Sequence, residues 1–235
     1  MRPLYLQDHG LREFDATVVS VNGLHVILDN TAFYPSSGGQ PNDTGVLVAD
    51  GVTYTVTNVT KTGGSIVHEL DAAGLHAGDR VHGVIDWQRR HALSRMHTAA
   101  HVLSAIIHKE AGALITGNQL GIDQSRIDFS LDVLDRETIA SYVEKANKAL
   151  ASRIPVKTYF LRREEALHIP GVVKLAAALP PNVSELHIVE IGSVDTQADA
   201  GTHVSNTDEV GRIELLRMEN KGKSNRRVYF ALRQP

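Results

Sequence analysis

Two histidines that stand four residues apart, His97 and His101, are the side chains of this sequence best suited to metal chemistry. They lie in a segment whose apolar spacing predicts a helix, so both imidazoles fall on one face, one turn apart, where they can share an ion. The chain contains twelve histidines, and a pair at this spacing is therefore common by chance. The pair alone does not establish a site.

A second pair with the same spacing, Asp199 and His203, lies in a loop that contains Gly201. Two such pairs on separate elements can supply three neutral imidazoles and one carboxylate, a set of ligands that suits zinc. The alternative interpretation is that Asp199 only caps a turn. The chain has no cysteine, which excludes disulfides, thiolate ligands and a cysteine nucleophile.

The bulk composition is that of an ordinary globular protein, with 42% hydrophobic and 22% charged residues over 235 positions. A net charge of −3 gives no overall signal for nucleic-acid binding, although local basic patches matter more than the sum. The N-terminus has no apolar leader, and no stretch approaches the 18 apolar residues of a membrane span. We therefore expect a cytoplasmic protein without a membrane partner.

The first 86 residues are predicted to be all-β, with a hairpin at Asn22-Gly23. Short strands separated by turns indicate a small barrel or sandwich. One segment is unlike a plain turn, because Gly38 and Gly39 let the backbone approach a ligand beside Gln40, although it can equally be a surface loop. The expected strands cover residues 15–21, 24–29, 44–48, 53–59, 65–70 and 80–86.

A long helix is predicted to begin after Asp86, a suitable N-cap, and to end near Gly112. His97 and His101 lie beside its apolar stripe, so they should face the interior or a cleft. Beyond it, helices and strands alternate without a clean βαβ repeat, which indicates an α+β fold. We expect helices over 136–152 and 163–168, strands over 126–131, 155–161, 187–191, 212–218 and 226–232, and leave 171–178 unassigned.

The residues around both histidine pairs resemble the zinc site of the alanyl-tRNA synthetase editing domain, which freestanding alanyl-tRNA editing proteins of the AlaX group share. Four further segments are similar to that family and follow its order along almost the whole chain. No room remains for an aminoacylation domain. These segments are the Gly-Gly-Gln stretch at 33–45, the helix entry at 86–90, the strand at 126–130 and the closing strand at 225–230.

The resemblance implies two domains, a β-barrel-like domain over residues 1–86 and a metal-binding editing domain over 87–235. In the second, a long first helix would pack on an antiparallel sheet. It also implies a site with one zinc ion, and a zinc-bound water as the attacking group. The alternative is that zinc only positions the amino acid or the terminal adenosine, while another group activates the water. The implied ligands are His97, His101, Asp199 and His203.

One residue departs from the family pattern, because Asp199 stands where a cysteine is usual. Asp199 can replace the thiolate as an anionic ligand, the interpretation that we favour. Alternatively, three histidines hold the ion, and Asp199 assists the bound water from outside the coordination sphere. The third alternative is that the site has lost its metal.

The implied reaction is hydrolysis of the ester in tRNA(Ala) that carries a wrong amino acid, chiefly serine and also glycine. Thr116 is the favoured reader of the serine hydroxyl, and the alternative for this segment is a solvated turn. The implied substrate-binding residues are Thr116, Asn118, Gln119 and Thr202. The implied tRNA-binding residues are Gly38, Gly39, Gln40, Arg217, Lys221, Lys223, Arg226 and Arg227.

Two other function classes remain open at this point. One is a non-catalytic tRNA-binding module that keeps the basic hairpin and lacks the metal. The other is a zinc hydrolase of small esters or amides on the same fold. A metalloprotease of the His-Glu-x-x-His type is disfavoured, because Thr98 follows His97. The sequence gives no indication of oligomeric state.

Overall fold

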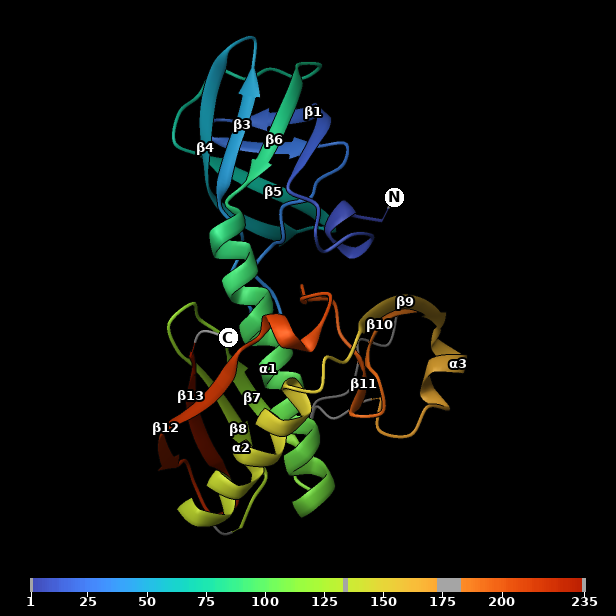
Figure 1. Ribbon diagram of the computed structural model, residues 1–235. Helices are drawn as coiled ribbons and strands as arrows, with labels where there is room; N and C mark the ends of the chain where they lie inside the picture. The colour runs from blue at the N-terminus through green and yellow to red at the C-terminus, as the bar shows by residue number, and fades with distance from the viewer. Residues whose placement is uncertain (1, 133–134, 173–182, 234–235) are drawn as a thin grey trace. The chain divides into compact units, whose positions relative to one another are not determined.

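The computed structural model describes residues 2–132, 135–172 and 183–233, and the chain divides into two compact units, Met1–Leu93 and Ser94–Pro235 (Figure 1). Helix α1 (Trp87–Ala111) begins in the first unit and continues into the second. The domain boundary that we propose after residue 86 therefore coincides with the start of this helix. No helix of the described residues is long and apolar enough to cross a membrane.

The first unit is a closed antiparallel barrel of six strands in the order β1-β2-β5-β4-β3-β6. The barrel rather than the sandwich alternative is therefore correct. The hairpin expected at Asn22-Gly23 joins β1 to β2, with Gly23 at a φ of 62°, a conformation that favours glycine. The elements are the 3₁₀ helix η1 (Leu4–Leu6), β1 (Glu13–Asn22), β2 (His25–Leu28), β3 (Gly45–Ala49), β4 (Val52–Thr62), β5 (Ser65–Leu70) and β6 (Arg80–Ile85).

Alternation along the strands fills the barrel. In β1, Phe14, Ala16 and Val18 are buried, whereas the residues before and between them are more exposed. Apolar side chains of this kind form one continuous core with Phe33 and Leu47. The period of two in the sequence thus places one face of each strand inside the barrel.

The second unit contains two antiparallel sheets. A four-stranded sheet has the order β12-β13-β8-β7, and a three-stranded sheet has the order β11-β10-β9. The strands are β7 (Ile115–Gln119), β8 (Ser125–Phe129), β9 (Val156–Arg162), β10 (Glu185–Ile191), β11 (Asp195–Ala198), β12 (Arg212–Asn220) and β13 (Arg226–Arg233). The remaining elements are α2 (Arg136–Leu150), α3 (Arg163–Leu167) and the 3₁₀ helix η2 (Thr207–Glu209).

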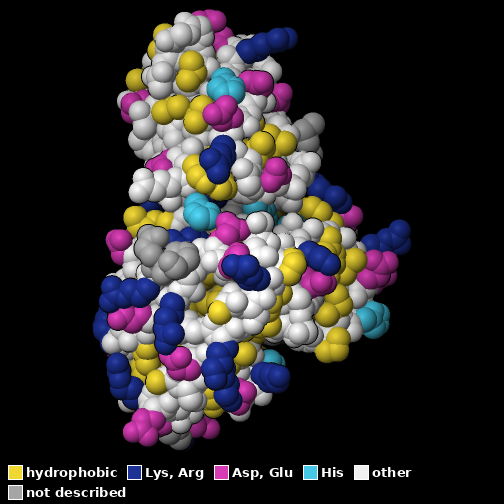
Figure 2. Space-filling model, in the orientation of Figure 1, with side chains coloured by type: hydrophobic (Ala, Val, Ile, Leu, Met, Phe, Trp, Pro, Cys, Tyr) yellow, Lys and Arg dark blue, Asp and Glu magenta, His cyan; other side chains and the backbone are white. Residues whose placement is uncertain are grey.

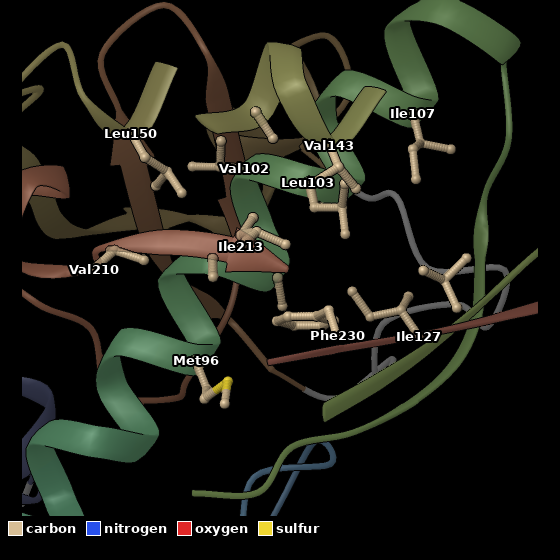
Figure 3. Packing of buried hydrophobic residues seen from close by; sticks show 14 of the residues in the cluster. Met96, Val102, Leu103, Ile107, Ile127, Val143, Leu150, Val210, Ile213 and Phe230 are labelled. Carbon is tan, nitrogen blue, oxygen red and sulfur yellow. The ribbon is translucent and has the colours of Figure 1, made fainter. Parts of the chain in front are cut away.

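Helix α1 begins and ends where the sequence predicts. The backbone N–H of Arg89 donates to Asp86 Oδ1 at 3.1 Å, which makes Asp86 the N-cap, and Gly112 follows the helix with a φ of 66°. The apolar side of α1 belongs to the same buried cluster as the strands of the four-stranded sheet (Figure 3). Members of that cluster include Met96, Leu103, Ile107, Ile127 and Phe230.

Two strands differ from the sequence expectation. The sequence assigns no strand to residues 115–119, where Thr116, Gly117 and Asn118 show no apolar alternation. In the structure they form the edge strand β7, which pairs only with β8. The short strand β11 was not predicted at all, because its four residues have little β propensity. It forms through pairing with β10, a contact distant from the local sequence signal. The unassigned segment 171–178 lies mostly outside the described residues.

Candidate metal centre

The second unit brings His97, His101, Asp199 and His203 together. One potential ligand atom from each lies within 4.8 Å of every other. The three imidazole rings are buried, and their centroids are 4.4 to 5.0 Å apart. Helix α1 supplies the first two histidines from adjacent turns, and the loop after β11 supplies the other two groups. The two pairs that the sequence places about a hundred residues apart thus form one cluster.

Asp199 points its carboxylate at two of these histidines. Its Oδ2 lies 3.2 Å from His203 Nε2, and its Oδ1 lies 3.6 Å from His97 Nε2. The backbone N–H of Gly201 donates to Asp199 Oδ2 at 2.6 Å, and the Asp199 N–H donates to the carbonyl of His187 at 3.0 Å. The side chain and the backbone of Asp199 are therefore both fixed, which favours a positioned ligand over a mobile surface carboxylate.

The protonation states suit a metal ion. Burial lowers the pKa of His97 to about 4 and the pKa of His203 well below its usual value, so both imidazoles are neutral at pH 7. Burial acts to raise the pKa of the Asp199 carboxyl, but its three histidine neighbours outweigh that effect and hold its pKa well below the usual range. Neutral imidazoles and an ionised carboxylate are the forms that bind metal.

Two further side chains fix the orientation of the histidine rings. Asp195, on β11, is buried and accepts a hydrogen bond from His101 Nδ1 at 2.8 Å. Thr98 Oγ1 donates to the carbonyl of Ser94 at 3.0 Å, so it must accept from His203 Nδ1, which lies 3.1 Å away. Each of these two imidazoles therefore carries its proton on Nδ1 and presents the lone pair of Nε2 to the cluster. A carboxylate behind a histidine ligand is common in zinc sites.

Sequence reasoning missed both Asp195 and Thr98. Thr98 lies between the two histidines of α1, and a polar residue between two ligands on a buried helix face was a usable signal. Asp195 had no comparable signal, because its strand was not predicted. Only the pairing of β11 with β10 places its carboxylate behind His101.

The donor set fits a zinc ion in its chemistry, and its ligand atoms converge to within 4.8 Å of one another. Tetrahedral bonds of about 2.0–2.1 Å place neighbouring ligand atoms roughly 3.3–3.4 Å apart. The Asp199 oxygens lie 3.2 Å and 3.6 Å from two histidine Nε2 atoms, close to that separation. The Asp199 carboxylate is therefore close enough to His97 and His203 to join them as a ligand.

Of the four residues predicted to bind the amino acid, three lie on β7, and the fourth, Thr202, lies in the loop that carries Asp199 and His203. Thr116 is exposed on β7, and its hydroxyl donates to Asn225 Oδ1 at 2.9 Å. Gln119 Oε1 accepts from Arg126 Nε at 3.2 Å, while Asn118 is half-buried on the same strand. Thr202 is buried one residue before His203, and its hydroxyl lies 2.8 Å from Ser94 Oγ.

The five predicted tRNA-binding cations lie together on the β12–β13 hairpin, but they differ in availability. Arg226 is buried and donates to backbone carbonyls, including that of Gly222 at 2.6 Å, so it stabilises the hairpin and is not a phosphate ligand. Arg227 forms two hydrogen bonds to Asp128, at 2.7 and 2.8 Å. Arg217 and Lys221 both pair with Glu219. On the visible face of this unit, Lys and Arg side chains are interspersed with Asp and Glu side chains (Figure 2).

The Gly-Gly-Gln segment forms a tight turn in the first unit. Ser37 and Gln40 exchange backbone hydrogen bonds across Gly38 and Gly39, whose φ angles are 56° and 88°. Both glycines are exposed, whereas the Gln40 side chain is 1% exposed. Burial therefore removes Gln40 from the residues that a tRNA can touch directly, and the exposed tip at Gly38-Gly39 keeps that potential.

Comparison with known proteins places both units in families of aminoacyl-tRNA synthetase domains. Residues 6–89 match the family described as tRNA synthetases class II (A), and residues 186–229 match the threonyl and alanyl tRNA synthetase second additional domain. The second match contains Asp199 and His203.

Relatives that match almost the whole chain identify the protein family more closely. The alanyl-tRNA editing protein AlaX-M of Methanosarcina barkeri is 49% identical over 97% of this chain and 98% of its own length. That of Saccharolobus solfataricus is 45% identical over 98% of both chains. The alanine–tRNA ligase of Methanothrix thermoacetophila is 41% identical over 94% of this chain but only 24% of the ligase. The chain therefore belongs to the freestanding alanyl-tRNA editing proteins, in the AlaX-M group.

Proposed function

We propose that this protein hydrolyses the ester that joins a wrong amino acid, chiefly serine and also glycine, to the 3′ end of tRNA(Ala). As a member of the alanyl-tRNA editing family, the chain is an aminoacyl-tRNA deacylase. The observation that carries the substrate and metal proposal is the cluster of three buried histidines and Asp199. It lies in a chain that matches editing proteins from end to end.

The proposed cofactor is one zinc ion held by His97, His101, Asp199 and His203. A bound zinc ion supplies a Lewis acid that polarises a carbonyl and brings the pKa of a water molecule towards neutrality. The chain itself orients the ligands, because Asp195 and Thr98 fix the rings of His101 and His203. Burial lowers the pKa of His97 and of His203, which keeps these two imidazoles unprotonated at neutral pH.

We favour direct ligation by Asp199 over a role beside the ion. Its oxygens lie at ligand-to-ligand distance from His97 Nε2 and His203 Nε2, and its charge equals that of the thiolate it replaces. An Asp199→Cys variant should keep zinc, whereas Asp199→Ala should lose zinc affinity. Equilibrium competition with a chelator measures both. Undiminished zinc affinity in Asp199→Ala, together with lost activity, would instead assign Asp199 to assistance beside the ion.

The tRNA side of the proposal rests on two exposed places, one in each unit. In the second unit, the hairpin between β12 and β13 presents Lys221 and Lys223, with Arg217 and Arg227 beside them. In the first unit, the turn tip at Gly38-Gly39 presents backbone N–H groups. Phosphate contacts of this type position a nucleic acid without reading its sequence. The acceptor end of tRNA(Ala) is the proposed partner.

The experiment that tests this function is deacylation of tRNA(Ala) charged with serine, glycine or alanine, by the zinc-loaded full chain. We expect hydrolysis of the seryl and glycyl esters and sparing of the alanyl ester. The His97→Ala and His203→Ala variants should lose both zinc and hydrolysis. A folded, zinc-containing protein that hydrolyses none of the three esters would contradict the assignment. Hydrolysis of small esters only would support the small-molecule alternative.

For the amino acid, the sequence favours Thr116 as the reader of the serine hydroxyl. A Thr116→Val variant should then reduce hydrolysis of Ser-tRNA(Ala) more than that of Gly-tRNA(Ala), because a site that pairs a hydroxyl depends on that bond. The ratio of the two kcat/KM values measures this. An unchanged ratio would reject Thr116 as the reader.

A further inference from the structure

The side-chain amide oxygen of Gln197 is buried and has no hydrogen-bond partner in the described chain. The residue is 4% exposed. A buried acceptor without a partner is costly and uncommon in native proteins, and each instance calls for an explanation. A ligand that donates to this amide would complete its hydrogen bonding.

The strand that carries Gln197 places it beside the metal-binding cluster. Side chains two residues apart share one face of a strand, so Gln197 shares the face of Asp195 on β11. Asp195 contacts His101 from one side, and Asp199, two residues beyond Gln197, contacts His203. Gln197 thus stands between two residues that both reach the histidines.

The pairing of β11 with β10 supports the same orientation independently. Gln197 lies opposite Val189, and Asp195 lies opposite Ile191. Val189 and Ile191 belong to the buried cluster that contains residues of α1, the helix of His97 and His101. The next residue, Ala198, belongs to a separate cluster on the other face with Ile188. Gln197 therefore faces the side of the sheet that α1 covers.

We propose that Gln197 is a specificity-determining residue that hydrogen-bonds the hydroxyl of the seryl group, a role that rests on the proposed editing function. A serine hydroxyl can donate to Oε1, and the two ends of a terminal amide exchange by rotation about its last bond. An alanyl group leaves the amide oxygen unpaired. Such a site discriminates against a substrate that lacks the hydroxyl far better than an apolar pocket does.

Thr116, Gln119 and Thr202, three of the four residues predicted from sequence, are less suited to this role, because their side chains already have partners. The Thr116 hydroxyl donates to Asn225, and Gln119 Oε1 accepts from Arg126. The Thr202 hydroxyl is within hydrogen-bond distance of Ser94. A substrate would have to displace these bonds, whereas the amide oxygen of Gln197 has none to lose.

The test compares Ser-tRNA(Ala) and Gly-tRNA(Ala) as substrates of the wild-type chain and of Gln197→Met. Methionine keeps the length and volume and removes both polar atoms. We expect the kcat/KM ratio of seryl to glycyl substrate to fall about tenfold or more, since glycine has no hydroxyl to lose. Gln197→Glu keeps an acceptor at the same length and should retain more of the seryl preference.

Two controls make the outcome decisive. The Thr196→Val variant changes the neighbouring residue on the opposite face of β11 and should leave the ratio unchanged. Zinc stoichiometry of every variant should stay at the wild-type value, because Gln197 is not a proposed ligand. An unchanged seryl-to-glycyl ratio in zinc-loaded Gln197→Met, or an equal loss on both substrates, would overturn this role while leaving the editing function intact. Absence of wild-type hydrolysis would overturn both.

Discussion

His101 and His203 each make a hydrogen bond through Nδ1 to a side chain that is not a proposed ligand. The two partners differ in charge. Thr98 offers His203 a neutral hydroxyl, whereas Asp195 offers His101 a fully buried carboxylate. A carboxylate that accepts from the distal ring nitrogen raises the basicity of the imidazole and fixes its tautomer. The charge of Asp195 should therefore contribute to metal affinity without touching the metal.

At this scale we predict that Asp195→Asn weakens zinc binding by about tenfold to a hundredfold. The amide can still accept from His101 Nδ1, but it lacks the charge that strengthens the bond. Competition with a chromophoric chelator at fixed pH measures the dissociation constant. Thr196→Val serves as the matched control on the same strand, and zinc affinity equal to wild type in Asp195→Asn would reject the contribution of Asp195.

At the scale of elements, the cations of the β12–β13 hairpin differ in the interactions that they make in the folded chain. Arg226 is used internally, Arg227 is paired with Asp128, and Arg217 stacks on the Tyr229 ring at 3.5 Å. Lys223 is exposed near the turn, and its ammonium has no ion-pair partner in the described chain. Lys223 is therefore the cation of this hairpin most available to a phosphate.

We predict that Lys223→Ala weakens tRNA binding equally for every attached amino acid. Loss of one phosphate contact should also reduce the slope of log K against log salt concentration by about 0.7–0.9. Titration of labelled tRNA(Ala) at several salt concentrations gives both values. Lys148→Ala, an exposed lysine on α2, is the control, and an unaltered salt slope in Lys223→Ala would show that this lysine contacts no phosphate.

The first turns of α1 carry a second element-scale feature, a buried ion pair within the first unit. Arg90 and Asp43 are both 0% exposed, and Arg90 Nε lies 2.9 Å from each carboxylate oxygen. Arg90 also donates to the carbonyl of Ala32, and Asp43 accepts from the Tyr34 N–H at 2.6 Å. The pair thus ties the start of the helix to the loop before β3.

Removal of one partner should be strongly destabilising, because it leaves an uncompensated buried charge. We predict that Asp43→Ala lowers the free energy of unfolding by about 3–5 kcal/mol. The exposed pair of Glu144 with Arg212, at 2.6 Å, gives the matched control, and Glu144→Ala should change stability by less than about 1 kcal/mol. Urea denaturation compares them, and similar small effects at both sites would refute a stabilising role for the buried pair.

For the molecule as a whole, His68 links stability to pH. This histidine lies inside the barrel, where Nδ1 donates to the carbonyl of Val26 and Nε2 accepts from the Thr31 hydroxyl. That hydroxyl in turn accepts from the Phe33 N–H. Burial lowers the pKa of His68 from 6.5 to about 4, so the folded chain keeps the ring neutral.

Because this pKa is depressed on folding, its contribution to stability is complete above pH 6.5 and is lost as the pH falls towards 4. Between pH 6.5 and pH 4, His68 binds a proton in the unfolded chain but not in the folded chain. We predict a decline of up to about 1.4 kcal/mol per pH unit from this residue. In the His68→Phe variant, the slope of the unfolding free energy against pH should be smaller by that amount. Denaturation at several pH values between 4 and 7 measures this slope. Equal slopes in the two proteins would contradict the assignment.

The sequence by itself determined the features that depend on local pattern. Alternating apolar residues and turn glycines predict the barrel strands, and the Asp86 cap and Gly112 predict both ends of α1. The four-residue spacing of His97 and His101 indicates a possible metal site, because i and i+4 side chains share one face of a helix. The resemblance then implies Asp199 and His203 as the other two ligands. The chain-long resemblance supplied the order of these parts.

Only the tertiary structure decided which polar groups meet. Asp195 and Gln197 lie on β11, a strand that exists through pairing with β10 and has little propensity of its own. The burial of Arg226 and Gln40 likewise depends on neighbours distant in sequence. Contacts between residues distant in the chain produce no periodic pattern in the sequence. The sequence therefore predicts the metal ligands, whereas the fold reveals the side chains that contact them and the buried amide oxygen of Gln197 beside them.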